Sequence, residues 1–360
     1  MKKIMLLNLL VGYACIVACS QQPNPDSLAK YVQQKTDLYF SRAKVPGILV
    51  YYCNGNQPAL YSTGYANPAT KAAFNENTFF EIGSITKTFT AYIILEVLDE
   101  NKITDSSFII PYLPDSVQSN TELANIRFIQ LLNHTSGLPR LPENMNLGEE
   151  TLQPYENYDA SKLFAYLKSA QLSAKKEYEY SNLGAALAGV LAERISKKSY
   201  SALLDQYIFL PFKMVDKNNS LEQSNNKSAG FIDDTTQAEY WNMNVMAPAG
   251  GLKCTAKEMG IYLSNMSKPL GTHNSSIVDS LTSPTHSLSA TVGVARGWHF
   301  NVAKNKPVIY WHNGGTYGFS TFAAFVKETG QWVMVVVNQF NKNNIVSDRL
   351  GMQIVQKMLE

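Results

Sequence analysis

The sequence predicts a fold of the α/β (α+β) class, in which an antiparallel sheet is built from both termini, is flanked by helices and carries a mostly helical insertion. Strand-like apolar runs occur near residues 47–63 and again at residues 308–337. The stretch from about residue 100 to residue 290, in contrast, consists mostly of helical patterns and long polar loops. With 45% hydrophobic and 17% charged residues, the chain has the composition of a globular protein.

The N-terminal residues predict export and attachment to a membrane. Two lysines precede an apolar stretch, residues 4–17, that is too short for a comfortable membrane span. The stretch ends in Ile-Val-Ala-Cys at residues 16–19, which resembles a bacterial lipobox. We therefore expect residues 1–18 to be a lipoprotein signal peptide and Cys19 to carry lipid. Residues 19–26 would then tether the protein to a membrane of the bacterial cell envelope, on the periplasmic or surface side. An ordinary cleaved signal is the alternative.

Charge and cysteine usage exclude several classes of function. The formal net charge is +2, and it falls to zero once Lys2 and Lys3 are removed with the signal peptide, so a nucleic-acid partner is not expected. Beyond the lipobox the chain contains Cys53 and Cys254, whose spacing fits no zinc or redox motif. We expect both to pack as small hydrophobic residues, although one bridge between them is compatible with the sequence.

The first part of the folded domain supplies a helix, a hairpin and a buried helix. Residues 27–39 have helical periodicity, and the strand-like residues 47–52 and 59–63 flank an Asn-Gly-Asn turn, which is a hairpin signal. Residues 78–82 form another strand-like run. Residues 84–98 are apolar on nearly all sides, as expected of a helix buried in the core.

The C-terminal part returns to strands and ends in a helix. Strand-like residues 308–311, 319–326 and 332–337 come first, with a Glu-Thr-Gly turn at residues 328–330, and a helix is predicted over residues 345–359. We therefore expect one domain over residues 27–360. Its parts would be a sheet subdomain of about residues 27–99 and 291–360 and a helical subdomain of about residues 100–290 with helices near 161–167 and 183–195.

The first candidate for chemistry is Ser-Ile-Thr-Lys at residues 84–87. On a helix, Ser84 and Lys87 lie on the same face about one turn apart, so the amine can contact the hydroxyl. Burial and the positive helix N-terminus both lower the pKa of a lysine, which lets it accept the serine proton near neutral pH. Four other Ser-x-x-Lys patterns occur, but only Ser84 follows a strand-like run and a glycine and begins a buried helix.

The second candidate is Tyr-Ser-Asn at residues 180–182, in a loop before a helix. The phenol of Tyr180 can carry a proton between nucleophile and leaving group, and the amide of Asn182 can orient the substrate and the lysine. Tyr-x-Asn occurs four more times, so the motif by itself equally fits a tyrosine of the core or of a turn.

The third candidate is His-Asn-Gly-Gly at residues 312–315, the only His-x-Gly of the chain, which follows a strand ending at Trp311. If this strand runs beside the nucleophile, the N–H groups of Gly315 and Ser84 form a two-donor oxyanion hole. Taken alone, the motif equally fits a glycine-rich turn that closes a hairpin.

In this order, the three motifs resemble those of the serine beta-lactamase and penicillin-binding-protein superfamily. The resemblance points to the branch that contains class C beta-lactamases, D-alanyl-D-alanine carboxypeptidases, D-aminopeptidases and family VIII esterases. Further agreement comes from Phe-Glu-Ile-Gly-Ser at residues 80–84, Leu-Leu-Asn-His-Thr-Ser-Gly-Leu-Pro at 131–139 and Ala-Pro-Ala-Gly-Gly-Leu at 247–252. The resemblance covers roughly residues 30–357 and implies a beta-lactamase/transpeptidase-like fold.

The resemblance also implies the composition of the site and the absence of a cofactor. Ser84 would be the nucleophile, while Lys87 and Tyr180 would handle the proton in an order that the sequence leaves open. His134 belongs to a segment expected to be structural, and no histidine suggests a metal site. The expected substrate-binding and oxyanion residues are Asn182, His312, Gly314 and Gly315.

His312 departs from the Lys-Thr-Gly motif of class C beta-lactamases. Lysine always offers a cation to the carboxylate of a beta-lactam, whereas histidine is mostly neutral at pH 7. We therefore expect a serine acyl-hydrolase for an ester or amide, of carboxylesterase or D-amino-acid peptidase type, with weak beta-lactamase or transacylase activity at most. The expected partner is a small-molecule or peptidoglycan-derived acyl substrate. The alternatives are a class C-like beta-lactamase and a penicillin- or peptidoglycan-binding sensor or scaffold with little turnover.

Aromatic residues in two loops, at about residues 140–159 and 217–246, bear on the substrate. They would line a pocket or, as we favour, cover the helical insertion. These residues are Tyr155, Tyr158, Tyr240 and Trp241.

Overall fold

A computed structural model describes residues 25–145, 151–173, 177–214, 224–340 and 346–360. The expected signal peptide, Cys19 and most of the expected tether lie outside the described residues. Within the described part, no helix is both long and apolar enough to cross a membrane.

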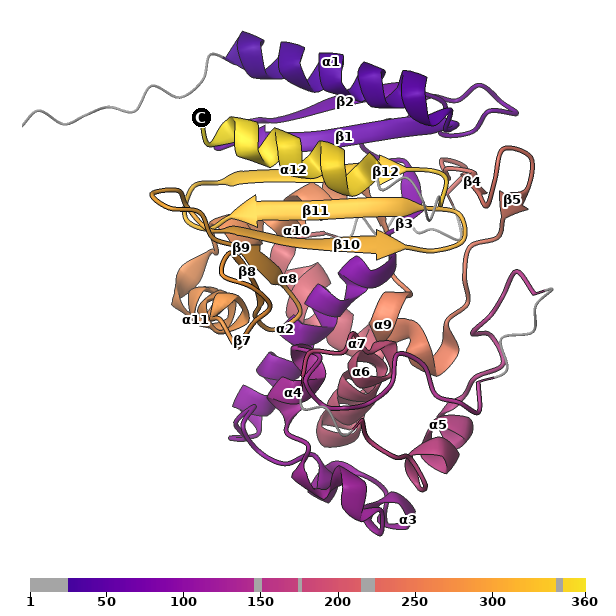
Figure 1. Ribbon diagram of the computed structural model, residues 1–360, viewed down its shortest axis with the longest axis vertical. Helices are drawn as coiled ribbons and strands as arrows, with labels where there is room; N and C mark the ends of the chain where they lie inside the picture. Colours follow the sequence, from indigo (N-terminus) through magenta and orange to yellow (C-terminus); the bar gives the residue numbers. More distant parts are fainter. Residues whose placement is uncertain (1–24, 146–150, 174–176, 215–223, 341–345) are drawn as a thin grey trace, which may run out of the picture.

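The molecule is organised around one antiparallel sheet of eight strands in the order β2-β1-β12-β11-β10-β9-β8-β7. The hairpin at the N-terminal end of the chain thus lies beside the last strand of the sequence (Figure 1). Two short antiparallel pairs, β3 with β6 and β4 with β5, lie outside this sheet. The strands are β1 (Gly47–Asn54), β2 (Pro58–Gly64), β3 (Phe79–Glu81), β4 (Gly230–Phe231), β5 (Gln237–Ala238), β6 (Lys253–Thr255), β7 (His286–Ser287), β8 (Val292–Val294), β9 (His299–Asn301), β10 (Ile309–Gly315), β11 (Ser320–Val326) and β12 (Gln331–Val337).

Twelve α-helices and five short helical turns of other types are described. The α-helices are α1 (Pro25–Ala43), α2 (Thr86–Glu100), α3 (Asp115–Gln118), α4 (Phe128–Leu132), α5 (Ala160–Leu167), α6 (Asn182–Ser196), α7 (Tyr200–Leu204), α8 (Leu210–Phe212), α9 (Ala247–Gly250), α10 (Ala256–Ser267), α11 (Gly271–Thr282) and α12 (Val346–Met358). The turns are η1 (Gly83–Ile85), η2 (Ile110–Tyr112), η3 (Thr121–Asn125), η4 (Asp205–Phe209) and η5 (Asn244–Met246).

Helices α1 and α12 cover one face of the sheet, as Figure 1 shows. Because successive side chains of a strand point to opposite faces, Ile48 and Val50 of β1 pack on this side, together with Val335 of β12. Leu350 and Ile354 of α12 fill the same cluster. The sheet is therefore buried on this face by the two terminal helices of the described chain.

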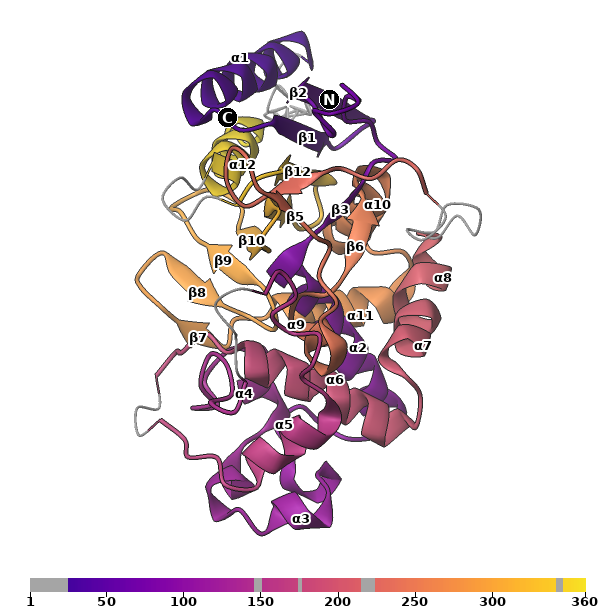
Figure 2. The ribbon, with the colours of Figure 1, turned by 90° about the vertical axis from the view of Figure 1, so that its right-hand side faces the viewer.

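The opposite face of the sheet shares one core with the helical part of the molecule. Leu49 and Trp332 of the sheet belong to the same buried cluster as Phe89 and Tyr262, which come from α2 and α10. Helix α2 is buried from Thr86 to Leu98 and contacts α6, α9 and α11. Figure 2 shows α2 running through the middle of the molecule, from the sheet into the helices. The beginning of α2 therefore lies where the two parts meet.

The structure confirms the expected fold class, the 54–56 hairpin and the buried helix, and it corrects three details. Helix α10, inside the predicted helical insertion, packs on the sheet strands β11 and β12. The strand predicted to end at Trp311 continues through Gly315 as β10, and Ser84 lies in the 3-10 turn η1 rather than in the helix proper. Cys53 and Cys254 are both buried and both free, so no bridge joins them.

Candidate active site

Ser84 lies at a sharp junction between β3 and α2. Gly83 makes the turn with a φ of +51°, in the left-handed region that favours glycine, and a Cβ atom there would lie 2.7 Å from the Gly315 nitrogen. Gly83 and Ser84 open the 3-10 turn, so the N–H of Ser84 has no partner inside that turn. The hydroxyl is half-buried. The chain thus presents the Ser84 side chain and N–H together at the end of β10.

The amine of Lys87 contacts three other residues of the site. Its Nζ lies 3.1 Å from Ser84 Oγ, 2.8 Å from Asn182 Oδ1 and 2.6 Å from the carbonyl oxygen of Ala249. The side chain is only 3% exposed. Three elements, α2, α6 and α9, therefore converge on one amine.

The surroundings of Lys87 favour its neutral form. Burial lowers its pKa well below the usual value for lysine, and the charge of Arg140 lowers that pKa further. A neutral amine has two N–H donors and one lone pair. With the two N–H groups donated to Asn182 and Ala249, the lone pair is left for the Ser84 hydroxyl. The geometry therefore allows Lys87 to accept the proton of Ser84.

Tyr180 and Asn182 are held in place by a buried hydrogen-bond network. Ser181 caps α6 by accepting from the Gly184 N–H at 2.8 Å, and its hydroxyl donates to the Pro139 carbonyl at 2.7 Å. The Ser181 N–H donates to His134 Nδ1 at 3.2 Å. The segment 133–139 thus fixes the start of α6, from which both side chains reach the site.

The Tyr180 ring lies beside the contact between the serine and the lysine. Its centroid is 4.9 Å from Lys87 Nζ, and its hydroxyl hydrogen-bonds to Ser84. Burial raises the pKa of Tyr180 well above its usual value, so the phenol keeps its proton at neutral pH. At neutral pH these two pKa shifts favour an amine of Lys87 that can accept a proton and a phenol of Tyr180 that can donate one.

The glycines of β10 allow the strand to lie directly against η1. A Cβ atom at position 314 would be 2.0 Å from the carbonyl oxygen of Ile82 and 2.4 Å from Thr321 Oγ1. Gly315 lies backbone to backbone with Gly83, the residue before Ser84. The N–H groups of Gly315 and Ser84 consequently belong to one small region beside the Ser84 hydroxyl, as a two-donor oxyanion hole requires.

His312 is buried and neutral. It is 1% exposed, and its Nδ1 lies 2.6 Å from the carbonyl oxygen of Asn313, which identifies Nδ1 as the protonated nitrogen. Burial lowers the pKa of His312 well below its usual value, and His299 and Lys87 contribute in the same direction. Its Nε2 has no hydrogen-bond partner among the described residues. His312 therefore offers an acceptor, not a cation, to whatever binds beside it.

The structure adds residues that the motifs do not contain. His134 is expected to be structural, and its ring centroid lies 4.4 Å from the ring centroid of Tyr180. The Tyr178 hydroxyl is 3.0 Å from His299 Nε2, and burial lowers the pKa of His299 to about 4. The Arg140 guanidinium lies 5.1 Å from the Tyr180 ring centroid. For Tyr178 the sequence does contain a signal. Successive side chains of an extended segment point to opposite sides, so Tyr178 and Tyr180 are expected on the same side.

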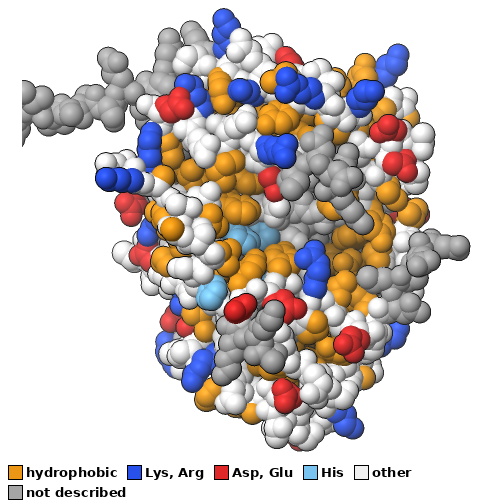
Figure 3. Space-filling model, in the orientation of Figure 1, with side chains coloured by type: hydrophobic (Ala, Val, Ile, Leu, Met, Phe, Trp, Pro, Cys, Tyr) orange, Lys and Arg blue, Asp and Glu red, His pale blue; other side chains and the backbone are white. Residues whose placement is uncertain are grey.

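Of the loop aromatics, Tyr155, Tyr158 and Trp241 are buried and Tyr240 is partly buried. The Tyr155 and Trp241 rings pack edge to face with centroids 5.1 Å apart, and Trp241 packs on Tyr317 at 4.9 Å. Tyr317 is two residues from Gly315, so this stack forms a wall next to the site. Figure 3 shows histidine side chains in the middle of this face, surrounded by hydrophobic side chains, between the sheet and the helices.

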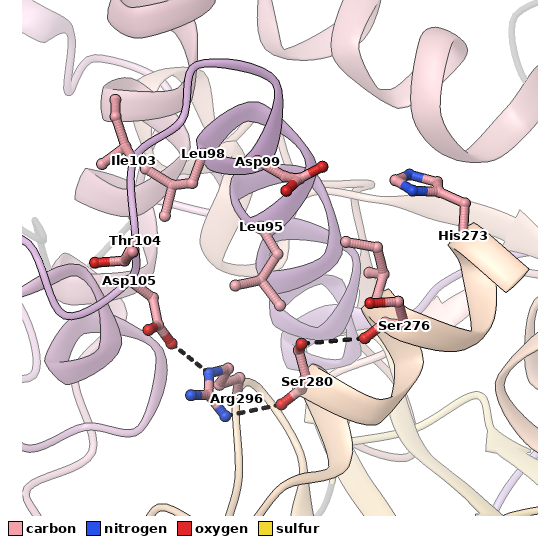
Figure 4. A pocket seen from close by; sticks show the side chains of 11 residues that line it. Leu95, Leu98, Asp99, Ile103, Thr104, Asp105, His273, Ser276, Ser280 and Arg296 are labelled. Atoms are coloured by element: carbon pink, nitrogen blue, oxygen red, sulfur yellow. Dashed lines mark hydrogen bonds and ion pairs between the residues drawn. The ribbon is translucent and has the colours of Figure 1, made fainter.

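A separate pocket of about 220 Å³ lies between α2 and α11 (Figure 4). Arg296 lies at its edge, where it forms an ion pair with Asp105 and donates a hydrogen bond to the Ser280 carbonyl. None of its lining residues belongs to the group around Ser84. In the part of the chain that the structure describes, no group of three or more His, Cys, Asp or Glu side chains could hold a metal ion.

Comparison with known proteins places this chain in a family. The family model described as Beta-lactamase matches residues 28–355. Similar curated proteins include beta-lactamases of Escherichia coli (24% identical over 256 residues, 70% of this chain and 65% of the relative) and Providencia stuartii (24% over 260 residues, 71% and 62%). An unguisins hydrolase of Aspergillus campestris is 25% identical over 368 residues, 95% of this chain and 66% of the relative. The chain thus spans less than two thirds of the length of these relatives.

The chain belongs to the beta-lactamase family.

Proposed function

We propose that this protein is a serine hydrolase that cleaves an ester or amide bond of a small or peptidoglycan-derived acyl compound through an acyl-enzyme on Ser84. One observation carries the proposal: the Lys87 amine lies 3.1 Å from the Ser84 hydroxyl while its two other contacts are taken by Asn182 and Ala249. A buried amine of lowered pKa in contact with a hydroxyl is the arrangement that activates a serine nucleophile.

In the proposed acylation, Lys87 accepts the Ser84 proton as Oγ bonds to the substrate carbonyl carbon. The N–H groups of Ser84 and Gly315 stabilise the oxyanion. The bond to the leaving group then breaks, and Tyr180 delivers a proton to that group and recovers one from Lys87. Water attacks the acyl-serine by the reverse route and releases the acid.

The state of His312 favours an ester or amide over a beta-lactam. A neutral histidine in place of lysine gives the third motif no cation for a beta-lactam carboxylate. The names of two relatives support a second candidate, a class C-like beta-lactamase. A third candidate is a penicillin- or peptidoglycan-binding sensor that is acylated but hardly turns over. Transfer of the acyl group to an alcohol instead of water is a variant of the first.

Side-by-side turnover of aryl esters with short and medium acyl groups, a D-amino-acid amide and a chromogenic cephalosporin tests these candidates. The full chain in mild detergent would be compared with Ser84→Ala and with Ser41→Ala, a matched control because Ser41 begins another Ser-x-x-Lys pattern and is exposed. We expect ester or amide turnover that exceeds cephalosporin turnover and is lost only in Ser84→Ala. Faster cephalosporin hydrolysis would favour the beta-lactamase, and a stable adduct without turnover would favour the sensor.

We further propose that lipid on Cys19 holds the enzyme at a membrane of the bacterial cell envelope, facing the periplasm or the surface. The support is the apolar stretch that ends in Ile-Val-Ala-Cys at residues 16–19. Expressed in a bacterium, the wild type should enter the detergent phase of a cloud-point extraction, and Cys19→Ala should stay in the aqueous phase. Equal partitioning of the two proteins would rule out lipid on Cys19.

A further inference from the structure

We propose that Arg140 binds a carboxylate on the leaving group of the substrate and so makes the enzyme selective for anionic esters or amides. This inference rests on the proposed function and extends it to the class of substrate.

The position of Arg140 is fixed relative to the catalytic candidates. Its carbonyl oxygen accepts hydrogen bonds from the N–H groups of Asn182 at 3.0 Å and Leu183 at 3.3 Å, so its backbone is tied to the first turn of α6. Its guanidinium lies 5.1 Å from the Tyr180 ring centroid. Lys87 Nζ approaches the same ring to 4.9 Å. A permanent cation is therefore held beside the pair that handles the proton.

The charge of Arg140 is exposed and not neutralised. The residue is solvent-exposed, and within the described chain its side chain makes no ion pair with a carboxylate. Its charge lowers the pKa of Lys87 and of His134, and no carboxylate contributes to those shifts or to the shift of Tyr180. Within the described chain, the Arg140 guanidinium is therefore available to an anionic ligand at the open side of the site.

Nearby charged residues do not take over this role. Glu177 and Glu179 are exposed. They alternate along the chain with Tyr178 and Tyr180, the two tyrosines whose rings contact histidines of the site. His312 is buried and neutral, so the opposite side of the site lacks the cation that its motif would otherwise supply. Arg140 thus provides, from another element, the cationic partner that a substrate carboxylate needs.

The contact with Tyr180 assigns the carboxylate to the leaving group. Tyr180 hydrogen-bonds to Ser84 and, in the proposed mechanism, protonates the leaving group. A group that departs past Tyr180 comes within reach of a guanidinium stacked on the same ring. Arginine holds a carboxylate with two parallel, charge-assisted hydrogen bonds, which also fixes its orientation.

The test compares two acetyl esters of the same shape, 3-acetoxybenzoate, which is anionic, and 3-acetoxybenzamide, which is neutral. The readout is the ratio of their kcat/KM values in the full chain, because a ratio cancels effects on the chemistry that both share. The ratio should favour the anion in the wild type and fall by roughly 10- to 100-fold in Arg140→Gln, since a hydrogen bond to a charged group is worth roughly 1.5–3 kcal/mol. Arg140→Lys should recover part of it.

Arg194→Gln is the matched control, because Arg194 also lies over an aromatic ring, that of Phe164 at 5.8 Å, on the outer side of α6. Its ratio should equal that of the wild type. A ratio that Arg140→Gln leaves unchanged would overturn the proposal.

Binding of the two phenols, 3-hydroxybenzoate and 3-hydroxybenzamide, measured by calorimetry, separates this proposal from the proposed function. If no ester is turned over, preferential binding of 3-hydroxybenzoate that is lost in Arg140→Gln still supports the carboxylate site. In that case the hydrolytic function fails alone. Equal binding of the two phenols, or a preference that survives Arg140→Gln, would refute the site.

Discussion

One methyl group at position 314 should separate the two N–H groups of the proposed oxyanion hole. In Gly314→Ala, the new Cβ would lie 2.0 Å from the Ile82 carbonyl oxygen. That oxygen is held in place, because it accepts from Thr321 Oγ1 at 3.0 Å and the Ile82 N–H donates to the Leu252 carbonyl at 3.2 Å. Since non-bonded atoms rest about 3.5 Å apart, β10 must move away from η1 by roughly 1 Å or more.

Two magnitudes follow from this displacement. Overpacking of a tight contact costs about 1–3 kcal/mol of stability, so Gly314→Ala should remain folded with a lower melting temperature. Loss of one oxyanion donor costs about 10²- to 10³-fold in kcat. Since Gly315 moves with the strand while Ser84 stays on η1, we expect kcat for an aryl acetate to fall by that amount. Thermal unfolding followed by circular dichroism would establish that the variant is folded.

Gly260→Ala is the matched control, because its Cβ would lie 2.6 Å from Tyr51 Cε1 and 2.8 Å from Trp332 Cη2, between α10 and the sheet. It should lose comparable stability and keep its kcat. A folded Gly314→Ala protein with kcat within about threefold of the wild type would refute the role assigned to the β10 glycines.

Two further predictions concern titrating groups. The proposed base is neutral Lys87, whose pKa burial lowers well below its usual value, so kcat/KM should level off well below pH 10. A kcat/KM that still rises about tenfold per pH unit at pH 10 would argue against Lys87 as a base of lowered pKa. Burial raises the pKa of the Asp348 carboxyl to about 6, so the folded state favours its protonated form. The stability that this proton provides is present at low pH and is lost as pH rises through about 4 to 6. Asp348→Asn, which keeps an acceptor for the Asn313 amide, should therefore gain about 1–3 kcal/mol relative to the wild type between pH 4.5 and 7.5 in urea unfolding, whereas a pH-independent difference would contradict this reasoning.

The elements around Ser84 could be predicted because local sequence specifies them. Ser84 and Lys87 stand three residues apart at the start of a run that is apolar on all sides, and such a run can only be a buried helix. The hairpin at residues 54–56 and the buried strands at both ends follow from turn residues and apolar runs in the same way.

The rest depends on contacts between distant segments. Two consecutive glycines usually indicate a turn, so the extension of β10 to Gly315 becomes predictable only once η1 is known to pack against it. Arg140 and His299 carry no motif. Arg140 reaches Tyr180 because its backbone is bound to the start of α6, and His299 reaches His312 from the start of β9. The contact of α10 with the sheet likewise reflects tertiary packing that helical periodicity does not reveal.

The most direct test of the Ser84 acyl-enzyme is mass spectrometry of the full chain, quenched in acid during the first turnovers of 4-nitrophenyl acetate. We expect an acetyl group on the peptide that contains Ser84 in the wild type and no acetylated peptide in Ser84→Ala. Acetylation of another residue together with undiminished turnover in Ser84→Ala would contradict it.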